Sequence, residues 1–535
     1  MDAVALEPGD VLPLVRELTG SPDPLALYRL LSDGGRRPGT FLLESAETGG
    51  GVGERSLVGV GIALRITCID HVVSVEAMSA NGHSILPWIA DRLATLDNPV
   101  VTTNGGMIHA FFPAPADGDR DEAARGKLPS PLDALRTVVL SVRLLAHPTD
   151  CCHLAAGVFS YDLIELFETL PVGGPEPART AHFELVVPDR FVLLDHVRHR
   201  ILLVANAYGG PGAQANYSDA VRAIGDLLEA VESAHAEPTS VSLRSANVAL
   251  PEMHADLSDE QYASLVLDLK RHIVAGDVFQ IVASRTFAAP CKDPLAAYAQ
   301  LRSANPSPYL FYVVGNDAVI FGASPETAVK VSGTPPRVTI RPIAGTAARG
   351  RNADGSIDED LDGRREAALR LDEKELAEHM MLVDLARNDV ARVSKPGTRR
   401  VTRLLTVDRY THVMHLVSEV VGELADGTDA LHAYAAALNM GTVVGAPKIR
   451  AAQILREVET TRRGTYGGAV GYIDNEGGMD TALLIRAAVV RDGTARVRVG
   501  AGIVFDSDPA SEALETRRKA TSVLQAIAAA EDVRG

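Results

Sequence analysis

The chain has 535 residues and a formal net charge of −17, which argues against nucleic acid as a ligand because phosphate backbones bind to concentrated basic surfaces. Hydrophobic residues make up 46 % and charged residues 23 % of the sequence, a balance that predicts a globular protein with a large buried core. No apolar run approaches the roughly 18 residues that a membrane helix needs. The acidic N-terminus, residues 1–7, also lacks a signal-peptide pattern. These features predict a cytoplasmic protein that binds neither nucleic acid nor a membrane.

Four cysteines are present, and none belongs to a Cys-x-x-Cys pair: Cys68, Cys151, Cys152 and Cys291. This pattern predicts reduced thiols rather than a zinc site or a disulfide framework.

Two polar stretches predict linkers in the chain. The first covers residues 113–127, and the second covers residues 233–245. The second linker divides the chain into an N-terminal region, residues 1–245, and a C-terminal domain, residues 250–530.

The C-terminal domain begins with a well-signalled helix. Ser258 and Gln261 form a capping-box pattern, apolar residues follow at helical spacing, and Gly276 is a natural stop. Strand-like runs follow at 277–282, 319–321, 338–343, 413–421 and 497–504, and helical segments at 360–392, 430–438, 446–458 and 510–530. Because these elements lack a strict strand–helix alternation, we expect an α+β fold with large antiparallel sheets packed as a sandwich with flanking helices.

Two pairs of glutamates have helical spacing, Glu375 with Glu378 and Glu512 with Glu515. Residues three apart share a helix face, and carboxylates brought together from two helices would repel without a cation. Oxygen ligands without His or Cys suit Mg²⁺. Spacing alone also fits two surface helices with ordinary charged faces, which are common.

Three glycine-rich segments expose backbone N–H groups that could bind an anion: residues 343–346, 441–448 and 500–502. None matches a Walker or dinucleotide motif, and each alone is more typical of a tight turn.

His415 and Arg486 interrupt apolar runs. A buried arginine needs an anionic partner, which a substrate carboxylate could supply, whereas a lone inward histidine is usually a hydrogen-bonded core residue.

Taken together, these segments resemble the chorismate-utilising enzymes, and within them the large subunits of anthranilate synthases of the enteric bacterial type. The resemblance extends from about residue 25 and is densest after residue 255. The matching motifs are 42–46 (LLESA), 305–309 (NPSPY), 322–326 (GASPE), 342–346 (PIAGT), 382–389 (LVDLARND), 408–410 (DRY), 413–417 (VMHLV), 445–448 (GAPK), 466–472 (YGGAVGY), 500–502 (GAG) and 512–519 (EALETRRK).

The resemblance implies a Mg²⁺-dependent enzyme that aminates chorismate and expels pyruvate. Glu378 and Glu515 would bind the metal, with Glu375 and Glu512 nearby. His415 would assist pyruvate elimination, Glu326 would act on the departing hydroxyl, and Gln280 would complete the catalytic set. The implied substrate-binding residues are Gly345, Thr346, Lys448, Tyr466, Arg486, Gly500, Ala501 and Gly502.

Two positions separate branches of this family. Isochorismate-forming members carry a water-activating lysine where Gln280 stands, and a neutral amide cannot be that base. Common aminodeoxychorismate synthases carry a nucleophilic lysine at the position of Ala344. Direct attack by ammonia is therefore favoured. Val444 departs from the usual Ser of the family. The alternatives are a 2-amino-2-deoxyisochorismate synthase, an aminodeoxychorismate synthase or a silent tryptophan-binding regulator.

The chain has no glutaminase cysteine motif, so the resemblance implies a separate amidotransferase subunit that supplies ammonia in a heterotetramer. It also implies feedback inhibition by L-tryptophan through a site in the N-terminal region. The residues that would line this site are Glu44, Ser45, Arg55, Pro308, Tyr309 and Leu310. Because residues 48–53 are rich in glycine, we expect a looser pocket and weaker inhibition than is usual for the family.

Overall fold

The computed structural model describes residues 6–45, 55–113, 128–149, 151–171, 180–236, 251, 253–410 and 413–532. The first predicted linker, apart from residue 113, and the glycine-rich stretch 48–53 lie outside these ranges. The second linker begins later than predicted, because helix α5 (Ala213–Ala236) continues to residue 236. Its remaining residues also lie outside the described ranges.

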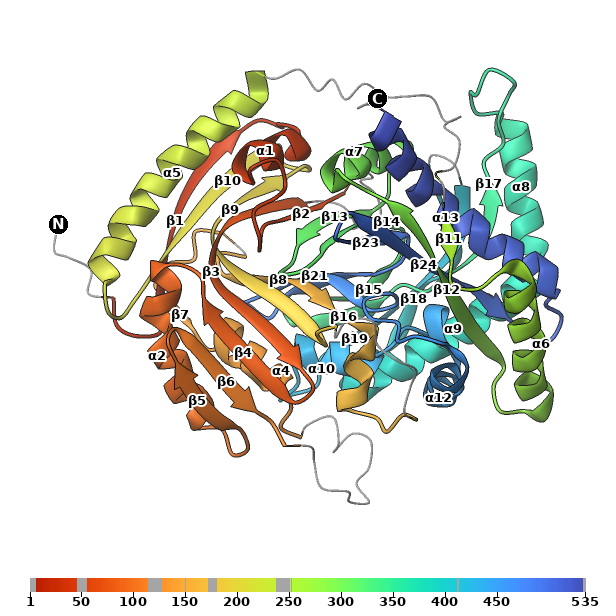
Figure 1. The fold of residues 1–535 in the computed structure, drawn as a ribbon, viewed down its shortest axis with the longest axis horizontal. Helices are drawn as coiled ribbons and strands as arrows, with labels where there is room; N and C mark the ends of the chain where they lie inside the picture. The colour runs from red at the N-terminus through yellow and green to blue at the C-terminus, as the bar shows by residue number, and fades with distance from the viewer. Residues whose placement is uncertain are drawn as a thin grey trace.

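Long antiparallel strands form most of the N-terminal half (Figure 1). These strands are β1 (Asp10–Thr19), β2 (Phe41–Glu44), β3 (Arg55–Ile69), β4 (Val72–Ala77), β5 (Val100–Asn104), β6 (Met107–Phe111), β7 (Arg143–Leu144), β8 (Leu154–Phe159), β9 (Phe183–Asp195) and β10 (Arg200–Tyr208). Helices α1 (Pro24–Leu31), α2 (Ala80–Ala94) and α4 (Leu132–Leu135) and short helical turns at Arg136–Leu140 and Tyr161–Leu166 accompany them. Helix α5 lies along the outer face of β1 and β10 (Figure 1).

The C-terminal half contributes the remaining strands. They are β11 (His254–Ala255), β12 (Gln280–Pro290), β13 (Tyr309–Val314), β14 (Val319–Ser324), β15 (Thr327–Ser332), β16 (Arg337–Ile340), β17 (Ile343–Ala348), β18 (Arg400–Arg409), β19 (Val413–Glu423), β20 (Gly445–Ala446), β21 (Ala469–Asp474), β22 (Met479–Leu483), β23 (Ala487–Arg491) and β24 (Thr494–Ile503). Its helices are α6 (Asp259–Ala275), α7 (Pro294–Ala304), α8 (Glu359–Leu371), α9 (Glu373–Val393), α10 (Ala430–Ala437), α11 (Gly441–Val444), α12 (Lys448–Val458) and α13 (Pro509–Asp532).

Strand pairing joins the two halves into one sheet network. Strand β2 pairs with β13, and β8 pairs with β21, so backbone hydrogen bonds link the N-terminal region to the C-terminal half. Among the described strands, every pairing except β1 with β7 is antiparallel. Helices α7 and α13 pack on one of the two main apolar cores, and α9, α10 and α12 pack on the other. The predicted α+β class with antiparallel sheets and flanking helices is confirmed.

Local signals in the sequence match several element boundaries. The capping box of Ser258 and Gln261 is formed, and Gly276 ends α6 with a positive φ of 82°. The predicted helix 360–392 is instead two helices, because Asp372 leaves the helical conformation to cap α9. The strand predicted from residue 277 begins at Gln280, since residues 277–279 form the connection from α6. No helix in the described residues is long and apolar enough to cross a membrane.

Candidate active site and regulatory pocket

The two glutamate pairs come from facing helices. Glu375 and Glu378 lie near the start of α9, while Glu512 and Glu515 lie near the start of α13. Burial, followed by the negative charge of Glu375, raises the pKa of Glu378 to about 7, and Glu515 and Glu512 add to this effect. Burial also raises the pKa values of Glu375 and Glu512. The four side chains therefore act on one another electrostatically, as the charge argument anticipated.

These carboxylates do not close around one point in this conformation. Glu515 forms an ion pair with Lys519 at 2.7 Å, and the Lys519 Nζ also donates to the carbonyl of Gly500 at 3.0 Å. Within the described ranges, no group of three or more His, Cys, Asp or Glu side chains is close enough to hold a metal ion. The donor chemistry suits Mg²⁺, and a cation would offset both the burial and the mutual repulsion that raise these pKa values.

Strands β12 and β24 bring Gln280 to the glycine segment and to the carboxylates. The Gln280 Nε2 donates to Glu378 Oε1 at 3.2 Å. A Cβ atom at Gly502 would lie 2.7 Å from Gln280 Nε2, and one at Gly500 would lie 2.7 Å from the Tyr466 hydroxyl. A side chain at either position would have to displace Gln280 or Tyr466, so the glycines keep these two side chains against the segment 500–502.

A second glycine lies beside His415, where β17 pairs with β19. Gly345 has a positive φ of 79° at an irregularity in the β17–β19 pairing. The His415 Nδ1 lies 2.9 Å from Thr346 Oγ1 and 3.3 Å from the Gly345 carbonyl oxygen. Burial, together with the positive charge of Arg486, lowers the pKa of His415 to about 4, so the imidazole is neutral at neutral pH.

Glu326 is a buried carboxyl group at the end of β14. Burial raises the pKa of Glu326 to about 8, and nearby Thr442 and Lys519 only partly offset this effect. The Thr442 hydroxyl is close enough to lower this pKa, but neither its Oγ1 nor Glu326 Oε1, both buried, makes a hydrogen bond of normal geometry. Unpaired buried polar atoms are rare in proteins, so they mark this position as one that a ligand could complete.

Arg486 is partly buried and adopts a positive φ of 49° directly before β23. Its guanidinium forms no ion pair with a described residue, and burial lowers its pKa. A guanidinium in this situation is a suitable site for a substrate carboxylate.

Lys448 has a different environment from the one that the resemblance implies. Its Nζ lies 2.7 Å from Asp389 Oδ1 and donates to the Ala437 carbonyl at 3.3 Å, and both charged side chains are buried. The lysine thus ties α12 to α9 in this conformation, and its role in substrate binding stays a prediction.

All six residues predicted for the inhibitor site line one cavity of about 450 Å³ between β2, β3, β13 and the β21–β22 hairpin. Glu44 is already engaged there, because it accepts from the Tyr298 hydroxyl and pairs with Arg302 at 2.8 Å. The cavity also includes Lys330, Tyr472 and Asp480, which sequence reasoning did not assign to it. Tyr472 stands in the matched motif 466–472 and could have been found there, whereas nothing local marks the other two.

Known proteins similar to this chain agree with the resemblance read from the motifs. A family model described as chorismate binding enzyme matches residues 114–525. Anthranilate synthase component 1 of Vibrio cholerae is 46 % identical over 512 residues, which cover 96 % of this chain and 95 % of that protein. The pyocyanine-specific anthranilate synthase component 1 of Pseudomonas aeruginosa is 45 % identical over 518 residues, covering 96 % and 94 %. The crystal structure of anthranilate synthase component I from Streptococcus pneumoniae superposes with a TM-score of 0.67 at 29 % identity, covering 89 % of this chain and 93 % of that one.

Proposed function

Since the chain belongs to the chorismate binding enzymes, we propose that it is the large subunit of an anthranilate synthase. The overall reaction converts chorismate and ammonia into anthranilate, pyruvate and water. The observation that carries this proposal is the pair of side chains at positions 280 and 344. Gln280 is a neutral amide that donates to Glu378, and Ala344 has no nucleophile, so neither water addition nor covalent attack by the enzyme has the group it needs.

Glu326 and His415 have the protonation states that this chemistry requires. Because its pKa is raised to about 8, Glu326 remains protonated at neutral pH and can donate a proton to the departing hydroxyl as ammonia adds to the ring. The Gly345 carbonyl can only accept a hydrogen bond, so it favours a proton on His415 Nδ1. The Nε2 lone pair is then available for the ring proton that is lost when pyruvate leaves.

The free guanidinium of Arg486 and the backbone of the glycine segments supply the anion-binding groups of the site. An acidic protein with a net charge of −17 needs such local positive charge to bind a dicarboxylate. We assign one carboxylate of chorismate to Arg486, because this side chain has no counter-ion among the described residues.

Glu378 and Glu515 would hold Mg²⁺, with Glu375 and Glu512 close by. When bound, the ion would neutralise the second carboxylate of chorismate and stabilise charge that develops in the reaction. The support for this assignment is the mutual electrostatic effect of the four carboxyl groups and their all-oxygen donor set. Glu515 would exchange its contact with Lys519, which lies on the same helix, for the ion.

Ammonia would come from a separate glutamine amidotransferase subunit in a heterotetramer, since the sequence contains no glutaminase motif. The cavity beside β2 would bind L-tryptophan as a feedback inhibitor. Its volume of about 450 Å³ is within the range of small-ligand sites, and it combines apolar walls with a few charged groups.

The test is incubation of the purified chain with chorismate, Mg²⁺ and an ammonium salt. We expect anthranilate fluorescence and an equal amount of pyruvate. An aminated product that retains the enolpyruvyl group has a higher mass than anthranilate, which mass spectrometry detects, and would instead identify a 2-amino-2-deoxyisochorismate or aminodeoxychorismate synthase. Absence of any chorismate conversion would contradict the proposal.

A further inference from the structure

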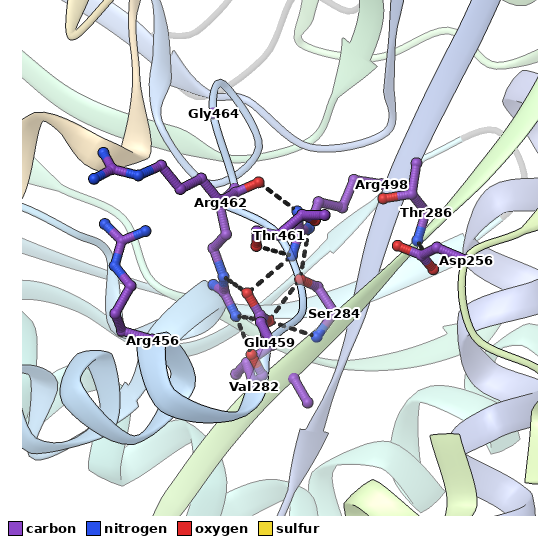
Figure 2. A network of polar contacts seen from close by, with 12 residues as sticks. Asp256, Val282, Ser284, Thr286, Arg456, Glu459, Thr461, Arg462, Gly464 and Arg498 are labelled. Carbon is purple, nitrogen blue, oxygen red and sulfur yellow. Dashed lines mark hydrogen bonds and ion pairs between the residues drawn. The ribbon is translucent and has the colours of Figure 1, made fainter. Parts of the chain in front are cut away.

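The structure contains a buried network of charged residues behind the proposed chorismate site, centred on Glu459 (Figure 2). Glu459 follows α12 and is only 7 % exposed. Its Oε1 accepts from the Ser284 backbone N at 2.9 Å and from the Ser284 hydroxyl at 2.7 Å. Arg463 and Arg498 complete the shell around the same carboxylate.

Arg463 forms a forked contact with Glu459. Its Nε donates to Oε2 at 2.9 Å and its Nη2 donates to Oε1 at 2.7 Å, while Arg498 Nη2 donates to Oε2 at 2.9 Å. Although burial alone would raise it, these two guanidinium groups hold the pKa of Glu459 below its usual range. The carboxylate is therefore ionised and fully paired.

The remaining N–H groups of Arg463 bind two backbone segments. Its Nη1 donates to the Val443 carbonyl and its Nη2 to the Val282 carbonyl, both at 2.6 Å. Its guanidinium also lies against the rings of Tyr161 and Tyr466, at 4.8 Å and 5.6 Å from their centroids. One arginine thus contacts β12, the one-turn helix α11 (called the 441–444 turn below) and the 464–468 loop.

Each segment joined by this network carries residues of the proposed active site. Strand β12 carries Gln280, the 441–444 turn carries Thr442 beside Glu326, the loop carries Tyr466, and β24 carries Arg498 together with the 500–502 glycines. The Tyr466 hydroxyl would lie 2.7 Å from a Cβ atom at Gly500, so the ring position fixed by Arg463 reaches the glycine segment.

We propose that Glu459 and Arg463 form a positioning pair that aligns the Tyr466 loop, the 441–444 turn and β12 around the substrate. The pair touches no substrate itself and acts through the segments that it holds. The inference rests on the proposed function for the identity of the substrate, whereas the alignment follows from the contacts alone.

The decisive variant replaces the pair with apolar side chains of similar size, Glu459→Leu with Arg463→Met. Replacing both members avoids the lone buried charge that either single substitution would leave. Arg498 and the Ser284 N–H lose Glu459 as a partner, but Arg498 keeps its contacts with Ser284, Thr461 and Arg462, so a folded protein of lower stability is expected. It loses the forked contacts, and we expect kcat/KM for chorismate to fall by about 10²-fold, the usual effect of small misalignments at an active site. We expect a rise in KM to account for part of this loss, measured at a temperature at which the variant is fully folded.

Arg65→Met is the matched control. Arg65 lies on β3 and is 8 % exposed; it pairs with Glu76 at 3.3 Å and donates to Asn316 at 3.0 Å, and none of these residues belongs to the proposed active site. This variant removes a similarly buried arginine, so it should leave the KM for chorismate unchanged.

A second variant keeps the positive charge and removes only the bidentate geometry of the guanidinium. Arg463→Lys retains a cation but cannot make the planar bidentate contact together with both carbonyl contacts. We expect at least a tenfold rise in KM for chorismate. If the double variant does not fold, the kinetics of Arg463→Lys alone test the positioning role.

Wild-type kinetic constants in the folded double variant, or in Arg463→Lys, would overturn the positioning role. The same would follow if activity fell only in proportion to the fraction of folded protein. Failure of the proposed function would be distinct, because the unaltered protein would then not convert chorismate.

Discussion

Glu326 and His415 are buried titratable side chains whose pKa values move in opposite directions. Burial raises the pKa of Glu326 to about 8, and burial with the charge of Arg486 lowers that of His415 to about 4. Between these values the carboxyl group is neutral and can give a proton, while the imidazole is neutral and can accept one. Pairs of groups separated in this way are typical of acid–base assignments at active sites.

This separation predicts an activity loss at alkaline pH. A carboxyl group with a raised pKa is protonated below that value and loses its proton as the pH rises through it, so kcat should fall above about pH 8. Glu326→Gln should lower kcat by ~10²-fold at pH 7 and remove the alkaline limb, since an amide cannot titrate. An unchanged pH–rate profile in this variant would exclude Glu326 as the acid.

His415→Met should slow the loss of pyruvate more than the amination. The thioether fills the buried space beside Thr346 but cannot accept a proton. We expect the aminated intermediate, which retains the enolpyruvyl group, to accumulate and to be detected by mass spectrometry. If the variant formed anthranilate at the normal rate with no intermediate, His415 would be a structural residue.

Glu378→Gln tests the metal assignment. It should lower activity by at least ~10²-fold, because charge stabilisation by a bound ion contributes several kcal/mol. Glu373→Gln is the control, since Glu373 lies on the same helix and is exposed. Full activity of the wild type and of Glu378→Gln in the presence of a chelator would refute a role for Mg²⁺.

At the scale of elements, one tyrosine connects the proposed inhibitor cavity to the proposed active site. The Tyr309 hydroxyl lies 3.0 Å from Thr327 Oγ1 and donates to Asp480 Oδ1 at 2.9 Å. Thr327 directly follows Glu326 in the chain. Strand β13, which forms one wall of the cavity, pairs with β14, which ends beside Glu326. A ligand that moves Tyr309 can therefore displace the proposed acid.

Tyr309→Phe should separate tryptophan binding from inhibition. The ring that walls the cavity remains, whereas its hydrogen bonds to Thr327 and Asp480 are lost. We expect tryptophan still to bind in calorimetry, with at least a fivefold weaker effect on the KM for chorismate, which corresponds to about 1 kcal/mol of coupling. Tyr28→Phe removes a similar Tyr–Thr hydroxyl contact of 2.9 Å elsewhere and should leave inhibition intact. Equal loss in both variants would argue against this connection.

Element boundaries were predictable where a short-range signal sets them. The capping box at Ser258 and the left-handed Gly276 depend on residues within one turn, so their pattern predicted α6 correctly. Asp372 lies between two stretches that both have helical spacing, and the sequence did not reveal the break there. The pairing of β2 with β13 joins segments more than 250 residues apart, and no local pattern encodes such a contact.

The candidate site likewise contains residues that a motif predicts and residues that only the packing of elements reveals. The motifs supplied Glu326, His415 and the glutamate pairs, because each motif states a residue type and a position. They could not supply the ion pair of Lys448 with Asp389 or the shell around Glu459, which depend on how separate elements pack. Nothing local in the sequence distinguishes the charged residues beside α12 from a solvated helix face, and only their burial identifies Glu459 and Arg463 as a network.

At the scale of the whole molecule, the chain should use ammonium salts but not glutamine. The cysteines of the sequence are all buried and lack a glutaminase motif, so hydrolysis of glutamine needs another protein. The measurement is anthranilate formation by the purified chain with each nitrogen source. Glutamine-dependent turnover without a partner would contradict the prediction.

If tryptophan binds in the cavity beside β2, the interleaved halves of the molecule predict that it competes with chorismate by favouring another conformation and not by occupying the same site. Strand β2 carries Glu44 and pairs with β13, and β13 pairs with β14, so a ligand between β2 and β13 acts on the sheet that also carries Glu326. If tryptophan favours a conformation with poor chorismate affinity, chorismate must weaken tryptophan binding by the same factor.

A chorismate titration at several tryptophan concentrations measures the effect of tryptophan on chorismate binding. Calorimetric titration of tryptophan with and without chorismate measures the reverse effect. We expect the two factors to agree.

Ser45→Phe should abolish inhibition while catalysis continues, because Ser45 lines the 450 Å³ cavity and a phenyl group would occupy space that the ligand needs. Inhibition that survives Ser45→Phe unchanged would place the effector elsewhere. Absence of inhibition in the wild type at millimolar tryptophan would mean that the cavity no longer serves a regulatory ligand.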